Sequence, residues 1–271
     1  MLTLSDTEKW RDQRERRFEL SRPDAQQVLT VLGANIPVVT YKGGPATTLV
    51  VTIYFDTANG HYLKRAQRGD GSVIKVRARE YFSVSDDDQR KIIDRLSECY
   101  LEKKQRIGSI RNKERARISK AELGPIINHT VSLPENCEFL RDEIDEQDLQ
   151  PALISMYERR VWGRGDLRVT LDERIRYYNP SDRVYGDTLA ACSPDPCSPG
   201  LLGAPAALGP KRILEVKHSA QIATASWLTD LLSTLPEALG FSKFIDGMAA
   251  LKQGNRTRSS LTRPVYSIPD Y

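Results

Sequence analysis

Charged and apolar residues alternate along several short segments of this chain, and this alternation constrains its fold more than any other feature. Residues at positions i, i+2 and i+4 of a β-strand share one face. Lys75, Arg77 and Arg79 therefore lie together, while Ile, Val and Ala occupy the intervening positions. The same pattern recurs at Glu102 and Lys104, at Arg168, Thr170 and Asp172, and at Glu215 and Lys217. Lys113, Arg115 and Arg117 form another cationic row, but the opposite row there is polar.

Two architectures explain a charged face on so many strands. The first is an ordinary antiparallel sheet with one side in water. Facing rows of Lys and Arg repel one another, however, unless an anion or interleaved acids compensate them. In a closed barrel of roughly eight strands the charged face lines a lumen just wide enough for a slender ligand. Such a ligand must be a polyanion, because Arg and Lys bind phosphate oxygens and carboxylates suit a hard divalent ion that bridges phosphates.

The predicted elements give an α+β fold, a closed eight-stranded antiparallel barrel with helices packed outside. Strands are expected over 14–20, 47–56, 61–65, 72–82, 98–106, 111–118, 152–162, 166–177 and 212–218. Helices are expected over 22–33 and just after 119, where capping residues precede each start, and over 135–149, 224–235 and 241–252. One domain should span 13–254, with loosely ordered tails at 1–12 and 255–271, a hairpin turn at 86–88 and a long surface loop over 179–210.

Composition and motifs exclude several classes of protein. The net charge of +4 from 40 basic and 36 acidic residues is too small to imply nucleic acid. No apolar run is long enough to span a bilayer and no leader is recognisable, so we expect a cytoplasmic protein without a membrane segment. The four cysteines lack metal-ligand spacing and are expected to be reduced thiols. There is no phosphate-binding loop of the G-x-x-x-x-G-K-[ST] type.

Eight short motifs give the chain a specific resemblance over residues 13–251. They are Glu15-Arg16-Arg17-Phe18, Tyr54-Phe55-Asp56-Thr57, Lys75-Val76-Arg77-Ala78-Arg79, Leu101-Glu102-Lys103-Lys104, Tyr157-Glu158-Arg159-Arg160, Arg168-Val169-Thr170-Leu171-Asp172, Leu214-Glu215-Val216-Lys217 and Phe241-Ser242-Lys243-Phe244. Each motif alone is weak, but their order along the chain resembles that of VTC domains, the polyphosphate polymerase members of the triphosphate tunnel superfamily.

The resemblance implies a tunnel of eight antiparallel strands that is shared with CYTH triphosphatases and adenylate cyclases. It implies transfer of the γ-phosphate of ATP, or another triphosphate, to inorganic polyphosphate, with Mn²⁺ or Mg²⁺ as cofactor. By motif, the catalytic residues are Arg77, Arg79, Lys104, Arg159 and Arg168. The substrate-binding residues are these five together with Arg17, Lys113, Arg115 and Lys243. The metal ligand is Glu215, with Glu15, Glu102 and Asp172 as further candidates.

Other interpretations stay open at this stage. The E-x-E-x-K signature of the wider superfamily appears here as Gln13-x-Glu15-x-Arg17, which weighs against a two-metal hydrolase. A tri- or polyphosphatase and a non-catalytic polyphosphate-binding module are the alternatives. Single-stranded nucleic-acid binding ranks last, because it would require aromatic platforms and the basic strand segments contain few. Taken alone, Glu215 reads as a solvated strand residue, and Glu102 and Asp172 read better as partners of arginines than as metal ligands. Arg77 and Arg79 are expected to face water and to add little to stability.

Overall fold

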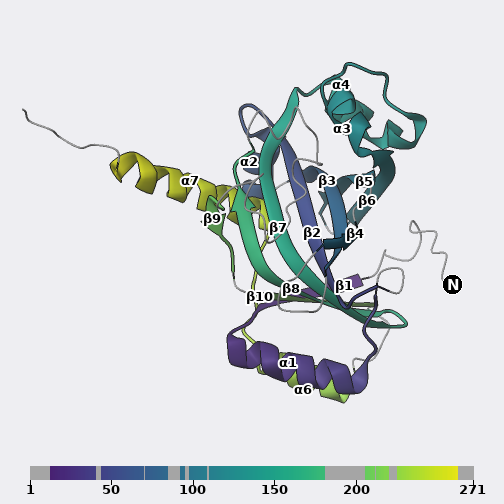
Figure 1. Cartoon of the computed structure of the whole chain (residues 1–271), viewed down its shortest axis with the longest axis vertical. Coiled ribbons are helices and arrows are strands. Elements are labelled where there is room, and N and C mark those ends of the chain that lie inside the picture. The colour runs from purple at the N-terminus through teal and green to yellow at the C-terminus, as the bar shows by residue number, and fades with distance from the viewer. Residues whose placement is uncertain are drawn as a thin grey trace, which may run out of the picture.

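An antiparallel sheet of long, curved strands forms the centre of the protein (Figure 1). The computed structural model describes residues 13–40, 44–69, 71–84, 92–94, 98–108, 110–180, 205–210, 212–219 and 225–261. The strands are β1 (Gln13–Glu19), β2 (Thr47–Thr57), β3 (Ser72–Val84), β4 (Ile92–Asp94), β5 (Glu98–Ile107), β6 (Ile110–Ser119), β7 (Leu149–Arg164), β8 (Leu167–Tyr178), β9 (Ala207–Leu208) and β10 (Arg212–Ser219). Eight of them follow the order β1-β10-β8-β7-β2-β3-β5-β6, with β4 beside β3 and β9 beside β8.

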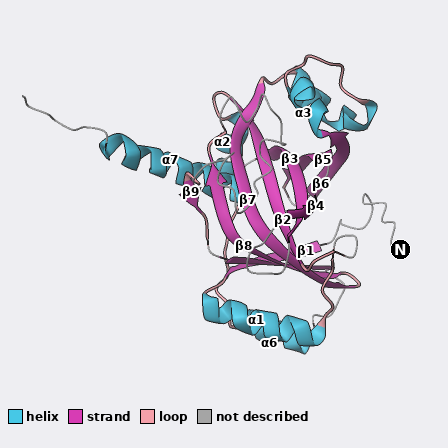
Figure 2. Cartoon of the chain, viewed as in Figure 1, coloured by secondary structure: helices cyan, strands magenta, loops and turns pink. Residues whose placement is uncertain are grey.

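Helices flank the strands (Figure 2). They are α1 (Arg22–Asn35), α2 (His61–Arg68), α3 (Lys120–Ile127), α4 (Arg141–Asp145), α6 (Ser226–Ser233) and α7 (Lys243–Leu261), with a 3-10 turn η1 (Glu135–Leu140) before α4. The predicted side-chain cap at Ser21 and the predicted capping box at Ser119 are confirmed, and Ser21 also forms a capping box, at the start of α1. None of the described helices combines the length and apolar character needed to cross a bilayer.

The strand predicted at 61–65 is wrong, because this segment begins helix α2. Its apolar residues Tyr62, Leu63 and Ala66 are buried at helical spacing. The carboxylate of Asp56, at the end of β2, accepts the backbone N–H groups of Tyr62 at 2.9 Å and Leu63 at 3.0 Å. A carboxylate just upstream of the helix, at the end of β2, therefore caps the first turn of α2, and residues 61–65 considered alone do not reveal this contact.

Other boundaries differ less from prediction. The helical region expected over 135–149 ends at Asp145, and β7 already begins at Leu149. Helix α7 continues to Leu261, beyond the expected end of the domain. Cys99 and Cys137 are free and buried. The acidic turn 86–88 and residues 181–204, with Cys192 and Cys197, lie outside the described residues.

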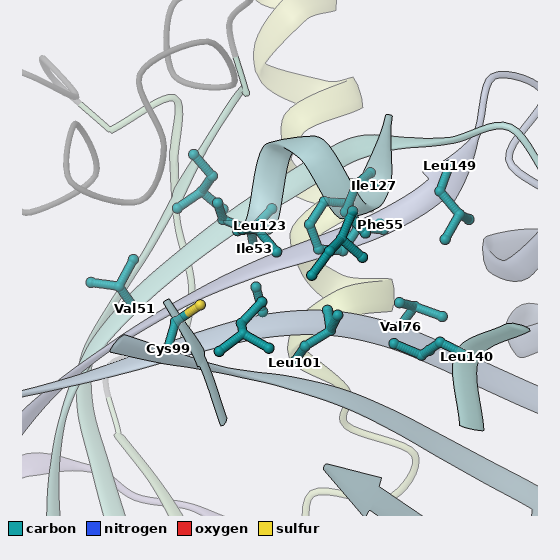
Figure 3. Packing of buried hydrophobic residues seen from close by; sticks show 14 of the residues in the cluster. Val51, Ile53, Phe55, Val76, Cys99, Leu101, Leu123, Ile127, Leu140 and Leu149 are labelled. Carbon is teal, nitrogen blue, oxygen red and sulfur yellow. The ribbon is translucent and has the colours of Figure 1, made fainter. Parts of the chain in front are cut away.

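The convex face of the sheet is apolar and the helices cover it in two places. Around β2, β3 and β5, side chains such as Val76 and Leu101 pack beneath α3, η1 and α4, and Figure 3 shows this cluster. Around β1, β8 and β10, residues such as Phe18 and Leu214 pack beneath α1 and α6. Each fully buried side chain of this size contributes roughly 1.5–3 kcal/mol. These two clusters stabilise the curved sheet, whose opposite, concave face carries the charged residues.

The predicted curled antiparallel sheet is confirmed, but closure of its hydrogen-bonded ladder is not. Strands β1 and β6 are the two edges of the path in the described part of the chain. A side-chain contact joins them: Nη1 of Arg111 on β6 lies 3.2 Å from Oε2 of Glu15 on β1. The sheet therefore curls far enough for its first and last strands to meet through an ion pair.

Candidate functional site: the charged concave face

Strand register carries the charged face across all eight strands. Thr52 on β2 lies opposite Arg79 on β3, and Arg77 on β3 lies opposite Glu102 on β5. At the other side of the path, Glu215 on β10 lies between Thr170 of β8 and Arg17 of β1. Directly opposed residues point to the same side of a sheet, so these side chains, which come from six strands, share one face.

Glu102 is the centre of the first charged cluster on this face. Its carboxylate accepts from Nε of Arg77 at 2.7 Å and lies 3.1 Å from Nζ of Lys113, with Arg79 at 3.8 Å. Burial opposes ionisation of this carboxyl, but the charges of Arg77 and Arg79 outweigh it and hold its pKa far below the ordinary value. Glu102 is fully inaccessible to solvent, and Arg77 and Arg79 are each only 7% exposed.

This cluster bears on two expectations: that Arg77 and Arg79 face water, and that Glu102 could be a metal ligand. Arg77 and Arg79 do not simply face water, since both are buried partners of a carboxylate and must contribute to stability. Glu102, a further metal candidate, has both of its oxygens next to cations. It serves as the counter-ion that holds three basic side chains in place.

Asp172 forms the second cluster and is also occupied by cations. Arg159 donates to it with two nitrogens, at 2.6 and 2.7 Å, and Nζ of Lys243 lies 2.6 Å away. Burial is again outweighed by Arg159 and Lys243, and the pKa of Asp172 is lowered. Lys243 is the first residue of α7, where a cation opposes the helix dipole unless an anion is near. Asp172 supplies that anion.

Glu15 and Glu215 form the third cluster, on the neighbouring strands β1 and β10. Arg17 contacts both carboxylates, through an ion pair with Glu15 and a 2.9 Å hydrogen bond to Glu215. Lys217 lies 3.0 Å from Glu215 and 3.7 Å from Glu15. Although burial opposes ionisation, Lys217 and Arg17 keep the pKa of Glu215 well below its ordinary value. Two carboxylates that share the cations Arg17 and Lys217 therefore lie close together on the face.

Lys104 and Arg168 differ from the other cations, because neither forms an ion pair or hydrogen bond with any described residue. Nearby Arg77, partial burial and Lys217 together hold the pKa of Lys104 well below its ordinary 10.5. Lys104 lies on β5 and Lys217 on β10, so this coupling acts across the curl of the sheet. Arg168 lies opposite Lys217 in the ladder. An anion here would meet positive charge that no described residue neutralises through an ion pair.

The first residues of α7 complete one end of the face. Nζ of Lys75 donates to Oγ of Ser242 at 2.8 Å, and Nη1 of Arg17 donates to the carbonyl of Phe241 at 2.9 Å. The ring of Tyr54 stacks on Phe244 with centroids 5.2 Å apart. Burial opposes ionisation of Tyr54, but Arg77, Arg79 and other cations lower its pKa. Helix α7 thus brings polar groups from a distant part of the sequence to the charged strands.

The structure brings every predicted site residue to this face. The set is Glu15, Arg17, Arg77, Arg79, Glu102, Lys104, Lys113, Arg115, Arg159, Arg168, Asp172, Glu215 and Lys243. The guanidinium of Arg115 lies 4.8 Å from the ring centre of Tyr100. The site residues predicted from the sequence do not include Lys75 and Lys217, although both lie in the same alternating rows as residues that were predicted. No local sequence pattern indicates that the hydroxyl of Ser242 belongs to this face.

A divalent ion suits the Glu15 and Glu215 pair better than any other acids on this face. Within the described residues, no group of three or more His, Cys, Asp or Glu side chains converges on one point. Proteins nevertheless commonly bind Mg²⁺ through only one or two carboxylates, and its remaining ligands are water and substrate phosphates. The hydroxyl of Thr170, opposite Glu215, is buried without a hydrogen-bond partner among the described residues. The donor set fits an ion that a bound phosphate helps to hold.

This arrangement of strands and charges can now be compared with known proteins. The model of one protein family, the VTC domain, matches residues 12–252. The chain belongs to the VTC domain family. No curated protein sequence matches this VTC domain.

Solved structures resemble this VTC domain in fold. A putative adenylate cyclase of Bacillus halodurans is 13% identical, with a TM-score of 0.42 over 96% of this chain and 94% of that one. A putative adenylyl cyclase of Hippeastrum, described as having a dominant triphosphatase activity, is 18% identical, with a TM-score of 0.43 over 90% and 96%. A putative adenylate cyclase of Vibrio parahaemolyticus is 11% identical, with a TM-score of 0.39 over 92% and 90%. At these values the likeness concerns the fold alone.

Proposed function

We propose that this VTC domain is a metal-dependent phosphotransferase that adds the γ-phosphate of ATP to inorganic polyphosphate within the charged concave face. One observation carries the proposal: Lys104 and Arg168 form no ion pair or hydrogen bond with any described residue, on a face where most other cations are paired with carboxylates and which also holds Glu15 and Glu215. Cations without an ion-pair partner, close to a pair of carboxylates, fit a phosphate chain that arrives with a divalent ion.

Phosphoryl transfer requires mainly that phosphates be positioned and that developing negative charge be stabilised. Arg159 is locked by two hydrogen bonds to Asp172, and Arg77 is locked by Glu102. Fixed guanidinium groups need no reorganisation when charge develops on the transferred phosphoryl group. Lys104 and Arg168 supply the excess charge that binds the substrate. No side chain of the protein needs to act as a nucleophile.

Glu215, together with Glu15, would hold the divalent ion, and the ion when bound withdraws charge from the phosphate oxygens. Arg17 and Lys217 contact the same two carboxylates. They compensate the negative charge of both acids before a substrate binds, and they keep the pKa of Glu215 low despite its burial. The carboxylates and the two cations therefore form one unit in which the placement of each group depends on the others.

The direct test is incubation of the purified protein with ATP and Mn²⁺ or Mg²⁺. Gel analysis would detect polyphosphate, and chromatography would separate ADP from free phosphate. Polymer formed together with ADP is the expected result. Free phosphate without polymer would instead establish a tri- or polyphosphatase, and binding without turnover under any divalent ion would leave a polyphosphate-binding module.

A second prediction concerns Lys104 and the number of protons that the protein takes up when it binds a polyanion. Nearby positive charge lowers its pKa, so part of the Lys104 population is neutral at alkaline pH below 10.5. A bound polyanion restores the charged form, and binding in that range should take up protons and strengthen as the pH falls. Titration calorimetry of tripolyphosphate in buffers of different ionisation enthalpy measures this uptake. Lys104→Met should reduce the uptake, whereas an unchanged uptake would assign it to another group.

A further inference from the structure

Helix α2 presents a second group of basic residues that the charged concave face does not include. His61, Arg65 and Arg68 stand at i, i+4 and i+7 of the helix, so they lie along one side of it. Together with Gly71 they line an open cavity of about 320 Å³. Among the described residues, none of the three forms an ion pair. Asp70, the nearest acid in sequence, lies outside the described residues.

Helix stability alone does not explain this stripe. Arg65 and Arg68 lie in the last turn, where cations favourably oppose the helix dipole. His61 lies in the first turn, and there the same argument disfavours positive charge. The N–H groups of this turn are already satisfied by Asp56 and by the hydroxyl of Thr57. The three residues share the cavity rather than a common role in the helix.

A row of cations connects this cavity with the charged concave face. Lys104 and Arg106 continue the Glu102 row along β5, since alternate residues of a strand share a face. Lys75 on β3 lies directly opposite Lys104. Nη2 of Arg106 donates to the carbonyl of Gly69 at 3.4 Å, immediately after the end of α2. The positive charge therefore runs from Lys104 through Arg106 to the turn that follows α2.

We propose that the α2 cavity, lined by His61, Arg65 and Arg68, is a second phosphate site that binds the distal phosphates of a linear polyphosphate whose other end occupies the charged concave face. The inference rests on the proposed function, because it requires that face to hold one end of the chain. A short oligophosphate reaches only the concave face. A long chain occupies both sites, and the second contact acts as an intramolecular one that raises affinity without altering the first.

The test compares Arg65→Gln/Arg68→Gln with the wild type, using tripolyphosphate and a size-selected long-chain polyphosphate as probes in calorimetric titrations. We expect the affinity for the long chain to fall about tenfold and that for tripolyphosphate to change less than about twofold. Arg22→Gln/Arg164→Gln is the matched control. Both of these arginines are exposed, and α1, which begins at Arg22, lies at the other end of the sheet from α2 (Figure 1). The control should bind both probes as the wild type does.

Three results would overturn the second site. The first is unchanged long-chain affinity in the α2 variant, and the second is an equal loss for both probes, which would place the effect in the concave face. The third is an equal loss of long-chain affinity in the control variant, which would show that the effect depends only on the net charge of the protein. Arg68→Gln alone, at an exposed position, repeats the test if the double variant melts at a lower temperature. A wild-type protein that binds neither probe would instead refute the proposed function, and the second site with it.

Discussion

Replacing Glu215 with glutamine should lower metal-dependent phosphoanhydride turnover by at least about 100-fold while polyphosphate binding survives. The substitution keeps the shape of the side chain and removes one of two adjacent carboxylates. The ion would then lose a ligand whose pKa the neighbouring Lys217 and Arg17 keep low despite burial. Lys104 and Arg168 would still bind the phosphates of the ground state. Turnover with ATP and Mn²⁺, and tripolyphosphate affinity without metal, measure the two effects separately.

Glu237→Gln is the matched control for this prediction. Glu237 forms an exposed ion pair with Arg16, away from the concave face, and its loss should leave both readouts unchanged. Near-normal metal-dependent turnover in Glu215→Gln would contradict the assignment of the metal. Loss of tripolyphosphate binding in the same variant would show that Glu215 mainly positions Arg17 and Lys217.

The charged face was predictable from sequence because its signal is local. Alternation within a strand assigns each residue to a face, and rows such as Lys75, Arg77 and Arg79 reveal their common side without any knowledge of neighbouring strands. The pairing of those charges is not local. Glu102 meets Arg77 across a ladder and Asp172 meets Lys243 of a helix 71 positions later, so the sequence left both acids open as metal ligands.

Helix α2 shows the opposite limit of sequence reasoning. Its eight residues combine buried Tyr62 and Leu63 with basic neighbours, and over five residues such a pattern fits a short strand as well as a helix. The contact that decides between them is made by Asp56, whose carboxylate caps the helix from the end of β2. That capping role also explains Asp56 within the Tyr-Phe-Asp-Thr motif without any catalytic duty.

Glu102→Gln should be the most destabilising single substitution on the concave face. It removes the buried carboxylate that neutralises Arg77, Lys113 and, more distantly, Arg79. Breaking a buried ion pair from one side costs about 3–5 kcal/mol. A loss of this size lowers the melting temperature by on the order of 10 °C in a domain of this length. Glu138→Gln, which removes an exposed partner of Arg141, is the control and should shift the melt little.

The pH dependence and a ligand distinguish a counter-ion from a metal ligand at Glu102. Its pKa in the folded protein lies far below the ordinary 4.5, because Arg77 and Arg79 outweigh burial. Its stabilisation is therefore complete above about pH 4.5 and is lost progressively as the pH falls below that value, where wild type and variant should converge. Tripolyphosphate should raise the melting temperature of Glu102→Gln more than that of the wild type, because it restores the missing negative charge. An equal rise, or a changed metal requirement for turnover, would assign Glu102 to the metal site instead.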